Sequence, residues 1–164
     1  MHYFAYGSNM SVSRLRKRVP SAEALGCFAL NGYDLRFHKS SKDGSAKCDA
    51  YLTKNAGDII YGVLFKIDPK EKPALDRAEG LGYGYAQEEI TVTASDGSSV
   101  TATTYIATKI DDNLKPYSWY VKHVLFGARD ASLPEQYIQE KIASIEAIED
   151  RNKVRDAEQR AIHN

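Results

Sequence analysis

The residue types that could carry out chemistry begin almost at the N-terminus, in Tyr3-Phe4-Ala5-Tyr6-Gly7-Ser8-Asn9-Met10. This segment has the pattern of a strand that turns at Gly-Ser-Asn before a helical stretch. Gly7 permits close approach and backbone angles that other residues lack, and successive N–H groups in such a turn can converge on an anionic oxygen. An ordinary strand-to-helix connection capped by Asn9 or Ser11 explains the same pattern, and it is the commoner case. A second feature is needed to choose.

That second feature is Leu75-Asp76-Arg77-Ala78-Glu79-Gly80, which has the pattern of a last helical turn closed by a glycine. A helix C-terminus is slightly negative, so a carboxylate at Glu79 is disfavoured by roughly 0.3 to 1 kcal/mol and its proton affinity rises. Most glutamates are solvated surface residues, and this one alone would be interpreted so. Asp76, one turn earlier on the same face, is the rival acid.

Read together, these two segments resemble the γ-glutamylcyclotransferase family, which releases 5-oxoproline from γ-glutamyl compounds. Three later segments are similar to the family in order and approximate spacing, and the resemblance runs from about Tyr3 to about Ile145. They are Thr104-Tyr105-Ile106, the stretch 120–128 (YVKHVLFGA), and Leu133-Pro134-Glu135-Gln136-Tyr137. The YGSN turn alone is a weak pattern, but followed by L-D-x-x-E-G and a late G-A-x-x-x-x-L-P-x-x-Y it is specific.

The resemblance implies a catalytic role for Glu79 as general base and then general acid, with Asp76 in support. It also implies a substrate pocket lined by residues of the first segment and by three later tyrosines: Tyr3, Tyr6, Gly7, Ser8, Asn9, Tyr85, Tyr105 and Tyr120. A strand or helix tyrosine is often a core residue with a bonded hydroxyl, and this alternative has equal weight for Tyr85 and Tyr105. Tyr120 is the better ligand candidate.

The stretch Gly80-Leu81-Gly82-Tyr83-Gly84 is a departure from the family pattern, since it is a residue shorter than in the animal enzymes. Tyr83 could therefore take the place of Tyr85 in the pocket. Three glycines also suggest a mobile flap over the site.

The function that follows is closure of a five-membered lactam, in which the α-amine of a γ-glutamyl amino acid or dipeptide attacks its own γ-carbonyl. The N-terminal turn would hold either the α-carboxylate or the developing oxyanion. A γ-glutamylamine substrate and a non-catalytic ligand or interaction module are the alternatives. In the family members specific for glutathione, the residues that follow Tyr-Gly-Ser differ from Asn9-Met10. This difference argues against glutathione itself as the substrate within γ-glutamyl and glutathione metabolism.

Composition sets further bounds. The 164 residues suit one domain, expected over 1–150 with a charged tail at 151–164. Lys plus Arg and Asp plus Glu both total 22, so the formal net charge is zero and no overall electrostatic field favours binding of nucleic acid.

The two cysteines, Cys27 and Cys48, lack metal or redox spacing, and the histidines are isolated, so neither metal nor cofactor is expected. Without a leader or a long apolar run, we expect a cytoplasmic protein that does not bind membranes.

The element pattern predicts an α+β fold: a small, mixed, mostly antiparallel β-barrel with peripheral helices, as the resemblance also implies. After the first strand, a helix is expected over 11–19, a hairpin of strands 23–30 and 33–38 across Asn31-Gly32, and strands at 47–53 and 58–67. Residues 61, 63, 65 and 67 alternate as in a half-buried strand.

Later in the chain, Asp68, Pro69 and Glu71 open a helix with a capping-box pattern, and Gly80 closes it. A β-pair is expected at 85–94 and 99–107, a loop at 111–116, and a helix containing Tyr120, Val124 and Leu125. A last helix opened by Pro134 carries isoleucines 138, 142, 145 and 148, whose face could pack internally or form a homodimer. Residues 149–164 could extend that helix or fray.

Overall fold

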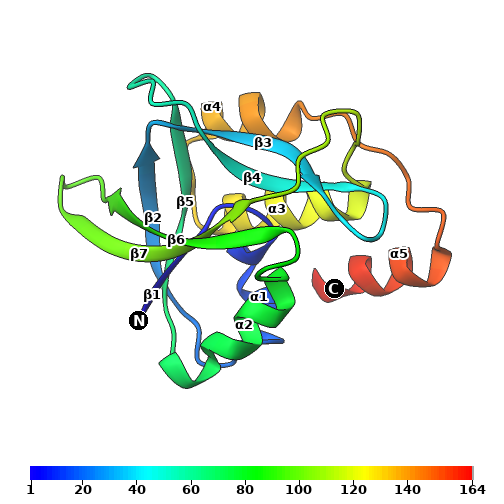
Figure 1. The fold of residues 1–164 in the computed structure, drawn as a ribbon, viewed down its shortest axis with the longest axis horizontal. Helices are drawn as coiled ribbons and strands as arrows, with labels where there is room; N and C mark the ends of the chain where they lie inside the picture. The colour runs from blue at the N-terminus through cyan, green and yellow to red at the C-terminus, as the bar shows by residue number, and fades with distance from the viewer. Residues whose placement is uncertain (164) are drawn as a thin grey trace.

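Five strands close into a barrel in the computed structural model, which describes residues 1–163. The order around the barrel is β1-β5-β2-β6-β7, with β1 parallel to β7 through Tyr3 and Thr103 and the remaining pairs antiparallel. This confirms the mixed, mostly antiparallel barrel (Figure 1). The strands are β1 (His2–Ala5), β2 (Glu23–Asn31), β5 (Ile59–Lys66), β6 (Tyr85–Thr93) and β7 (Ser99–Ala107).

The central strand β5 is more buried than its alternating pattern predicts. Ile60, Val63, Leu64 and Phe65 are all almost inaccessible to solvent, although they point to opposite faces of the strand. One reason is that β5 pairs with β1 and β2 and also touches β3, which lies outside the barrel. The half-buried interpretation of this strand is therefore wrong.

A second sheet consists of two strands, β3 (Tyr33–Ser40) and β4 (Ala46–Leu52), which pair with each other and with no strand of the barrel (Figure 1). The hairpin expected across Asn31-Gly32 is wrong, because β2 pairs with β5 and β6 instead of β3. Gly32 does have a positive φ of 83°, but its N–H donates to the carbonyl of Asp58 and its carbonyl accepts from Thr53 and Lys54. The turn at Gly32 thus connects β2 of the barrel to β3 of the second sheet.

The first helical region is divided into a 3₁₀ turn η1 (Ser8–Met10) and a short helix α1 (Val12–Arg16). Ser11, one of the two caps considered, accepts from the N–H of Arg14 and so begins α1. Asn9 lies within η1, and its side chain is free for another contact. The expected helix over 11–19 is shorter because it ends at Arg16, in a turn before Pro20.

The second helical region begins as predicted at Asp68 and ends as predicted at Gly80, whose φ is 72°. It consists of a 3₁₀ turn η2 (Pro69–Glu71) followed by α2 (Lys72–Glu79). The capping box does not form, since the Glu71 carboxylate accepts from Ser21 instead of from Asp68. The end of α2 places Glu79 at the last helical position.

The C-terminal part contains α3 (Ser118–Asp130), α4 (Glu135–Tyr137), the π-helical turn η3 (Ile138–Ala143), α5 (Lys153–Arg160) and the 3₁₀ turn η4 (Ala161–His163). Ile138 and Ile142 are buried, so the first half of the isoleucine face packs internally. Ile145 and Ile148 lie beyond the helix, which ends at Ala143, and this part of the expectation is wrong. As far as His163, the tail neither extends that helix nor frays, since α5 forms a separate helix near α3 (Figure 1).

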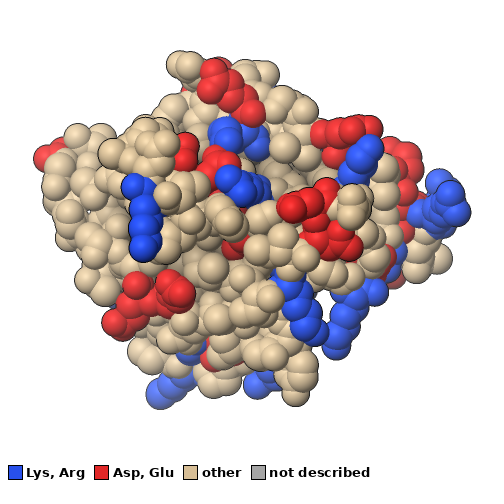
Figure 2. Space-filling view, turned by 45° about the horizontal axis from the view of Figure 1, so that its top comes forward, with Lys and Arg blue, Asp and Glu red and all other residues tan. Residues whose placement is uncertain are grey.

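On the face seen in Figure 2, positive and negative side chains are interspersed among uncharged ones. Over residues 1–163, the structure contains no helix with the length and apolar character needed to cross a bilayer.

Candidate active site

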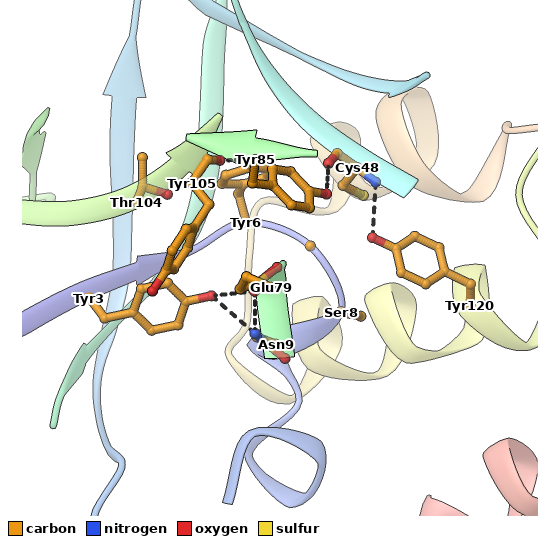
Figure 3. Close-up of a pocket in the computed structure, with 11 residues that line it drawn as sticks. Tyr3, Tyr6, Ser8, Asn9, Cys48, Glu79, Tyr85, Thr104, Tyr105 and Tyr120 are labelled. Carbon is orange, nitrogen blue, oxygen red and sulfur yellow. Dashed lines mark hydrogen bonds between the residues drawn. The ribbon is translucent and has the colours of Figure 1, made fainter. Parts of the chain in front are cut away.

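One pocket is lined by Glu79 and by all eight residues that the sequence predicted to bind the substrate (Figure 3). The pocket lies where β1 runs into η1, beside the end of α2, the second sheet, β6, β7 and α3. Its walls are formed by Tyr3, Tyr6, Gly7, Ser8, Asn9, Cys48, Glu79, Tyr85, Thr104, Tyr105 and Tyr120. The N-terminal turn and the glutamate, seventy residues apart in sequence, therefore meet around a single small space.

The carboxylate of Glu79 is held by the N-terminal segment (Figure 3). The Asn9 amide donates to Oε1 at 2.6 Å, and the Tyr3 hydroxyl donates to the same oxygen at 3.3 Å. Asn9 also donates to the Tyr3 hydroxyl at 3.2 Å, which closes a triangle. Within residues 1–163, no hydrogen bond is recorded to Oε2 of Glu79. One carboxylate oxygen thus fixes the side chain, and the other is available for a substrate.

Burial raises the pKa of Glu79 above that of an ordinary glutamate, because the carboxyl group is densely surrounded by protein. The hydrogen bond from Tyr3 and the positive charges of Arg14, Arg18 and Lys39 oppose this rise. The sequence argument ascribed the raised proton affinity to the helix end, whereas burial is the leading cause in the structure. A group with this protonation behaviour can both accept and return a proton.

Asp76 is engaged in a different way. Its Oδ1 accepts from the Tyr105 hydroxyl at 2.6 Å and also from the ammonium of Lys72, with which it forms an ion pair. Lys72 donates further to Gln87 on β6 at 2.6 Å. Asp76 is not among the residues that line the pocket. This arrangement suits an aspartate that positions Tyr105 and links α2 to the barrel.

The N-terminal turn contacts the second sheet and α3 directly. A Cβ at Gly7 would lie 3.0 Å from the Cβ of Cys48 and 3.4 Å from the Tyr120 hydroxyl. The φ of Gly7 is −117°, so close approach, and not a left-handed conformation, accounts for glycine here. In the described chain, no protein acceptor is recorded for the N–H groups of Gly7, Ser8 and Asn9. These groups could bind an anionic oxygen of a ligand.

Three tyrosines surround the rest of the pocket with hydroxyls that already bond to protein. Tyr6 donates to the Tyr105 carbonyl, and Tyr85 donates to the Cys48 carbonyl at 2.5 Å. The Tyr120 hydroxyl accepts from the Cys48 N–H at 2.9 Å, so its own proton remains to be donated. The backbone of Cys48 is thus held from both sides. Among these tyrosines, Tyr120 retains the clearest capacity to bind a ligand.

The choice between Tyr83 and Tyr85 is decided by exposure. Tyr85 is 7% exposed and lines the pocket, whereas Tyr83 is 73% exposed and lies outside it. The intervening glycine-rich loop contains its own hydrogen bonds, including Gly82 N–H to the Tyr85 carbonyl and Tyr83 N–H to the Gly80 carbonyl. Mobility of this loop stays a prediction.

Two lining residues, Cys48 and Thr104, were not predicted as site residues. Thr104 belongs to a segment that carries the family resemblance, and its hydroxyl donates to the Phe4 carbonyl at 2.8 Å. Cys48 is also a buried core residue, and burial raises the pKa of its thiol to about 12. The sequence gives no sign that β4 would cross the pocket. Residues 1–163 contain no cluster of three or more His, Cys, Asp or Glu suited to a metal ion.

Comparison with known proteins places this geometry in a family. Residues 59–140 match the model of the AIG2-like family. The γ-glutamylcyclotransferases of Mus musculus and Homo sapiens are each 32% identical to the chain, over 94% and 88% of it and over 83% and 78% of their own lengths. A solved structure of a γ-glutamyl cyclotransferase superimposes with a TM-score of 0.87 at 29% identity, covering 99% of this chain and 98% of that one. The chain belongs to the γ-glutamylcyclotransferase family.

Proposed function

We propose that this protein is a γ-glutamylcyclotransferase that converts a γ-glutamyl amino acid or dipeptide into 5-oxoproline and a free amine. The observation that carries the proposal is the Glu79 carboxyl group, enclosed in the pocket and held by Asn9 and Tyr3 through one oxygen. Family membership supports the same reaction. The pocket also presents polar groups on several sides, as a site for a charged small molecule requires.

The reaction is intramolecular, so the pocket mainly has to fold the substrate into attack geometry. In well-oriented cases, this contribution is on the order of 7 to 11 kcal/mol. Glu79, through its free oxygen, takes a proton from the α-ammonium so that the amine can attack the γ-carbonyl. After the tetrahedral intermediate forms, the same carboxyl group returns the proton to the departing nitrogen. The α-ammonium loses two protons in becoming the lactam N–H, and the departing nitrogen gains two in leaving as an ammonium. The second proton passes from the ring nitrogen to the departing amine by the same route, so that proton and charge balance and no other reactant is consumed.

The N-terminal turn supplies the anion-binding part of this mechanism. The N–H groups of Gly7, Ser8 and Asn9 bind an anionic oxygen of the substrate, and the Tyr120 hydroxyl beside Gly7 adds a further donor. Asn9 has two functions, because its side chain orients Glu79 while its backbone belongs to the turn. Glu79 and the anion site are therefore coupled by one residue.

The test is Glu79→Gln, assayed for 5-oxoproline release from a panel of γ-glutamyl dipeptides and γ-glutamyl amines. The amide keeps the size of the side chain and can still accept from Asn9, but it cannot take up the proton. We expect kcat to fall by at least about 10²-fold, the lower range of a general acid–base contribution. Glu89→Gln, at an exposed glutamate on β6, is the matched control and should retain full activity.

Undiminished turnover in Glu79→Gln would move the catalytic role to Asp76 or elsewhere. Absence of 5-oxoproline from every substrate with the unmodified protein would favour a non-catalytic ligand-binding module. Release from γ-glutamyl amines alone would assign the protein to the γ-glutamylamine alternative.

A further inference from the structure

A second, larger hollow adjoins the pocket and shares Glu79 with it. Its empty space is about 950 Å³ and is open to solvent. It is lined by Lys39, Ser40, Ser41, Lys42, Arg77, Ala78, Glu79, Gly80, Tyr83 and Lys109. We call this surface the basic groove. Four of its ten residues are cationic and one is acidic, in a chain whose formal net charge is zero.

Three separate segments bring the cations of the basic groove together. Lys39 lies in β3, and Lys109 follows β7; a bridge between Lys39 and Ile110 and the hydrogen bond from Ser40 N–H to the Lys109 carbonyl (2.9 Å) hold these segments together. Lys42 follows in the turn after β3, where its ammonium lies 5.8 Å from the centre of the Tyr83 ring. Arg77 comes from the last turn of α2. This clustering depends on tertiary structure and is invisible in the sequence.

These four cations have no acidic partner in the described part of the chain. None of the ion pairs or side-chain hydrogen bonds among residues 1–163 involves the charged group of Lys39, Lys42, Arg77 or Lys109. The nearby Asp43 carboxylate is occupied by Lys47 at 2.8 Å and by Ser45. Among residues 1–163, the only carboxylate that lines the basic groove is Glu79, which is already bonded to Asn9 and Tyr3. The positive charge of the groove is therefore left for an external anion.

Lys39 lies at the junction between the basic groove and the pocket. Its ammonium is 4.7 Å from the centre of the ring of Tyr85, a pocket residue. A Cβ at Gly84 would lie 2.8 Å from Lys39 Cε, so that glycine makes room for the lysine stem. Burial lowers the pKa of Lys39, and the negative charge of Glu79 opposes this change. Lys39 therefore lines the basic groove and also lies next to a pocket residue.

We propose that the basic groove is the subsite for the departing amino acid, and that it selects γ-glutamyl compounds whose leaving group carries negative charge beyond the scissile nitrogen. The inference rests on the proposed function, because Glu79 must meet the departing nitrogen to protonate it. A leaving group attached to that nitrogen then continues into the groove that Glu79 shares. An α-carboxylate reaches the first cations, and an acidic side chain adds a second charge near the others. An uncharged leaving amine makes neither contact.

The test compares γ-glutamyl-glutamate with γ-glutamyl-glutamine, which differ in charge but scarcely in shape. Exposed charge pairs are individually weak, so we expect kcat/KM to be roughly three- to tenfold higher for the acidic substrate at low salt. The ratio should decrease as salt is added. In the double variant Lys42→Met/Lys109→Met the ratio should approach one, because the kcat/KM for γ-glutamyl-glutamate falls more than that for γ-glutamyl-glutamine. Lys66→Met, at an exposed lysine on β5, is the control and should keep the full ratio.

The outcomes separate this subsite from the reaction itself. Turnover of both substrates with equal kcat/KM, or a ratio unaffected by the double variant, would overturn the subsite and leave the proposed reaction intact. If neither substrate is converted, the proposed reaction fails. Calorimetric binding of the two compounds to Glu79→Gln then decides the subsite, and equal affinity would overturn it.

Discussion

At the scale of single residues, Glu79 combines two roles that oppose each other energetically. A carboxyl group suits proton transfer when its pKa is raised, and here burial raises it. The same burial disfavours the ionised form of the folded protein. Asn9 and Tyr3 offset part of that cost through their hydrogen bonds to Oε1. The site thus keeps a buried carboxyl group whose raised pKa suits proton transfer, at a cost to the stability of its ionised form.

This opposition predicts how Glu79→Gln changes stability with pH. Because the folded pKa is raised above the unfolded value, the native state binds more protons than the unfolded state between those two pKa values. Stability of the unmodified protein therefore decreases as pH rises through that window, and the variant lacks this loss. We expect the two proteins to differ least in acid and the variant to gain relative stability toward neutral pH.

Urea unfolding of both proteins across that pH range measures the difference in the free energy of unfolding. Glu89→Gln should follow the unmodified protein at every pH. A Glu79→Gln variant that loses relative stability as pH rises would contradict the burial argument, since it would mean that the carboxylate is favoured in the folded state.

At the scale of elements, helix α3 packs directly on the backbone of the N-terminal turn. A Cβ at Gly127 would lie 2.5 Å from Met10 C and 2.5 Å from Ser11 N. Both are backbone atoms, so they cannot move aside as a flexible side chain would. The same turn carries Asn9, which holds Glu79. Gly127, the glycine of the late Gly-Ala pair in the family resemblance, therefore allows α3 to pack against the turn that holds Glu79.

Gly127→Ala separates helix propensity from packing. In an exposed helix interior, this change stabilises by about 0.8 to 1 kcal/mol. Overpacking typically costs about 1 to 3 kcal/mol, and contact with backbone is the unfavourable extreme. We expect a net loss of about 1 to 2 kcal/mol in the free energy of unfolding, with reduced kcat as the turn shifts. Thermal unfolding and the 5-oxoproline assay measure the two effects.

Gly57→Ala is the control for Gly127→Ala, because its Cβ would meet only Asn55 Oδ1 at 3.4 Å, an ordinary contact. It should change neither stability nor turnover appreciably. Should Gly127→Ala stabilise the protein, the close packing of α3 on the turn would be wrong.

Elements were predictable from sequence where their signals are local. The β6–β7 pair, the end of α2 at Gly80 and the strand-turn at the N-terminus each depend on neighbouring residues, and each lies where expected. The Asn31-Gly32 hairpin failed because the turn signal was correct but the partner of β2 is decided by distant strands. Cys48 lines the pocket and Lys39 lines the basic groove because the second sheet, which contains both, lies beside the barrel. That placement has no local signature.

At the scale of the whole molecule, the C-terminal segment joins parts that are far apart in sequence. The side-chain amide oxygen Oε1 of Gln159 on α5 accepts from Arg14 of α1 at 2.9 Å and from His123 Nε2 of α3 at 2.9 Å. His163 contacts the Ser11 hydroxyl at 2.7 Å, directly after the N-terminal turn. Arg14 in turn is one of the charges that oppose the raised pKa of Glu79. Hydrogen bonds of the C-terminal segment therefore hold α1 and the residue after the N-terminal turn, both of which lie close to the candidate site.

Gln159→Leu should reveal how much this connection contributes. The leucine keeps similar bulk but leaves Arg14 and His123, both largely enclosed, without their acceptor. An unsatisfied buried donor costs about 1 to 3 kcal/mol, and more when the donor is charged, so we expect a loss of about 2 kcal/mol in the free energy of unfolding. Burial already lowers the pKa of His123 to about 4, so this histidine is neutral near pH 7 and the loss there arises mainly at Arg14. Glu158→Leu, the same new side chain at the exposed neighbouring position, should cost little. Equal effects of the two variants in urea unfolding would show that α5 only covers the surface and does not hold α1 against α3.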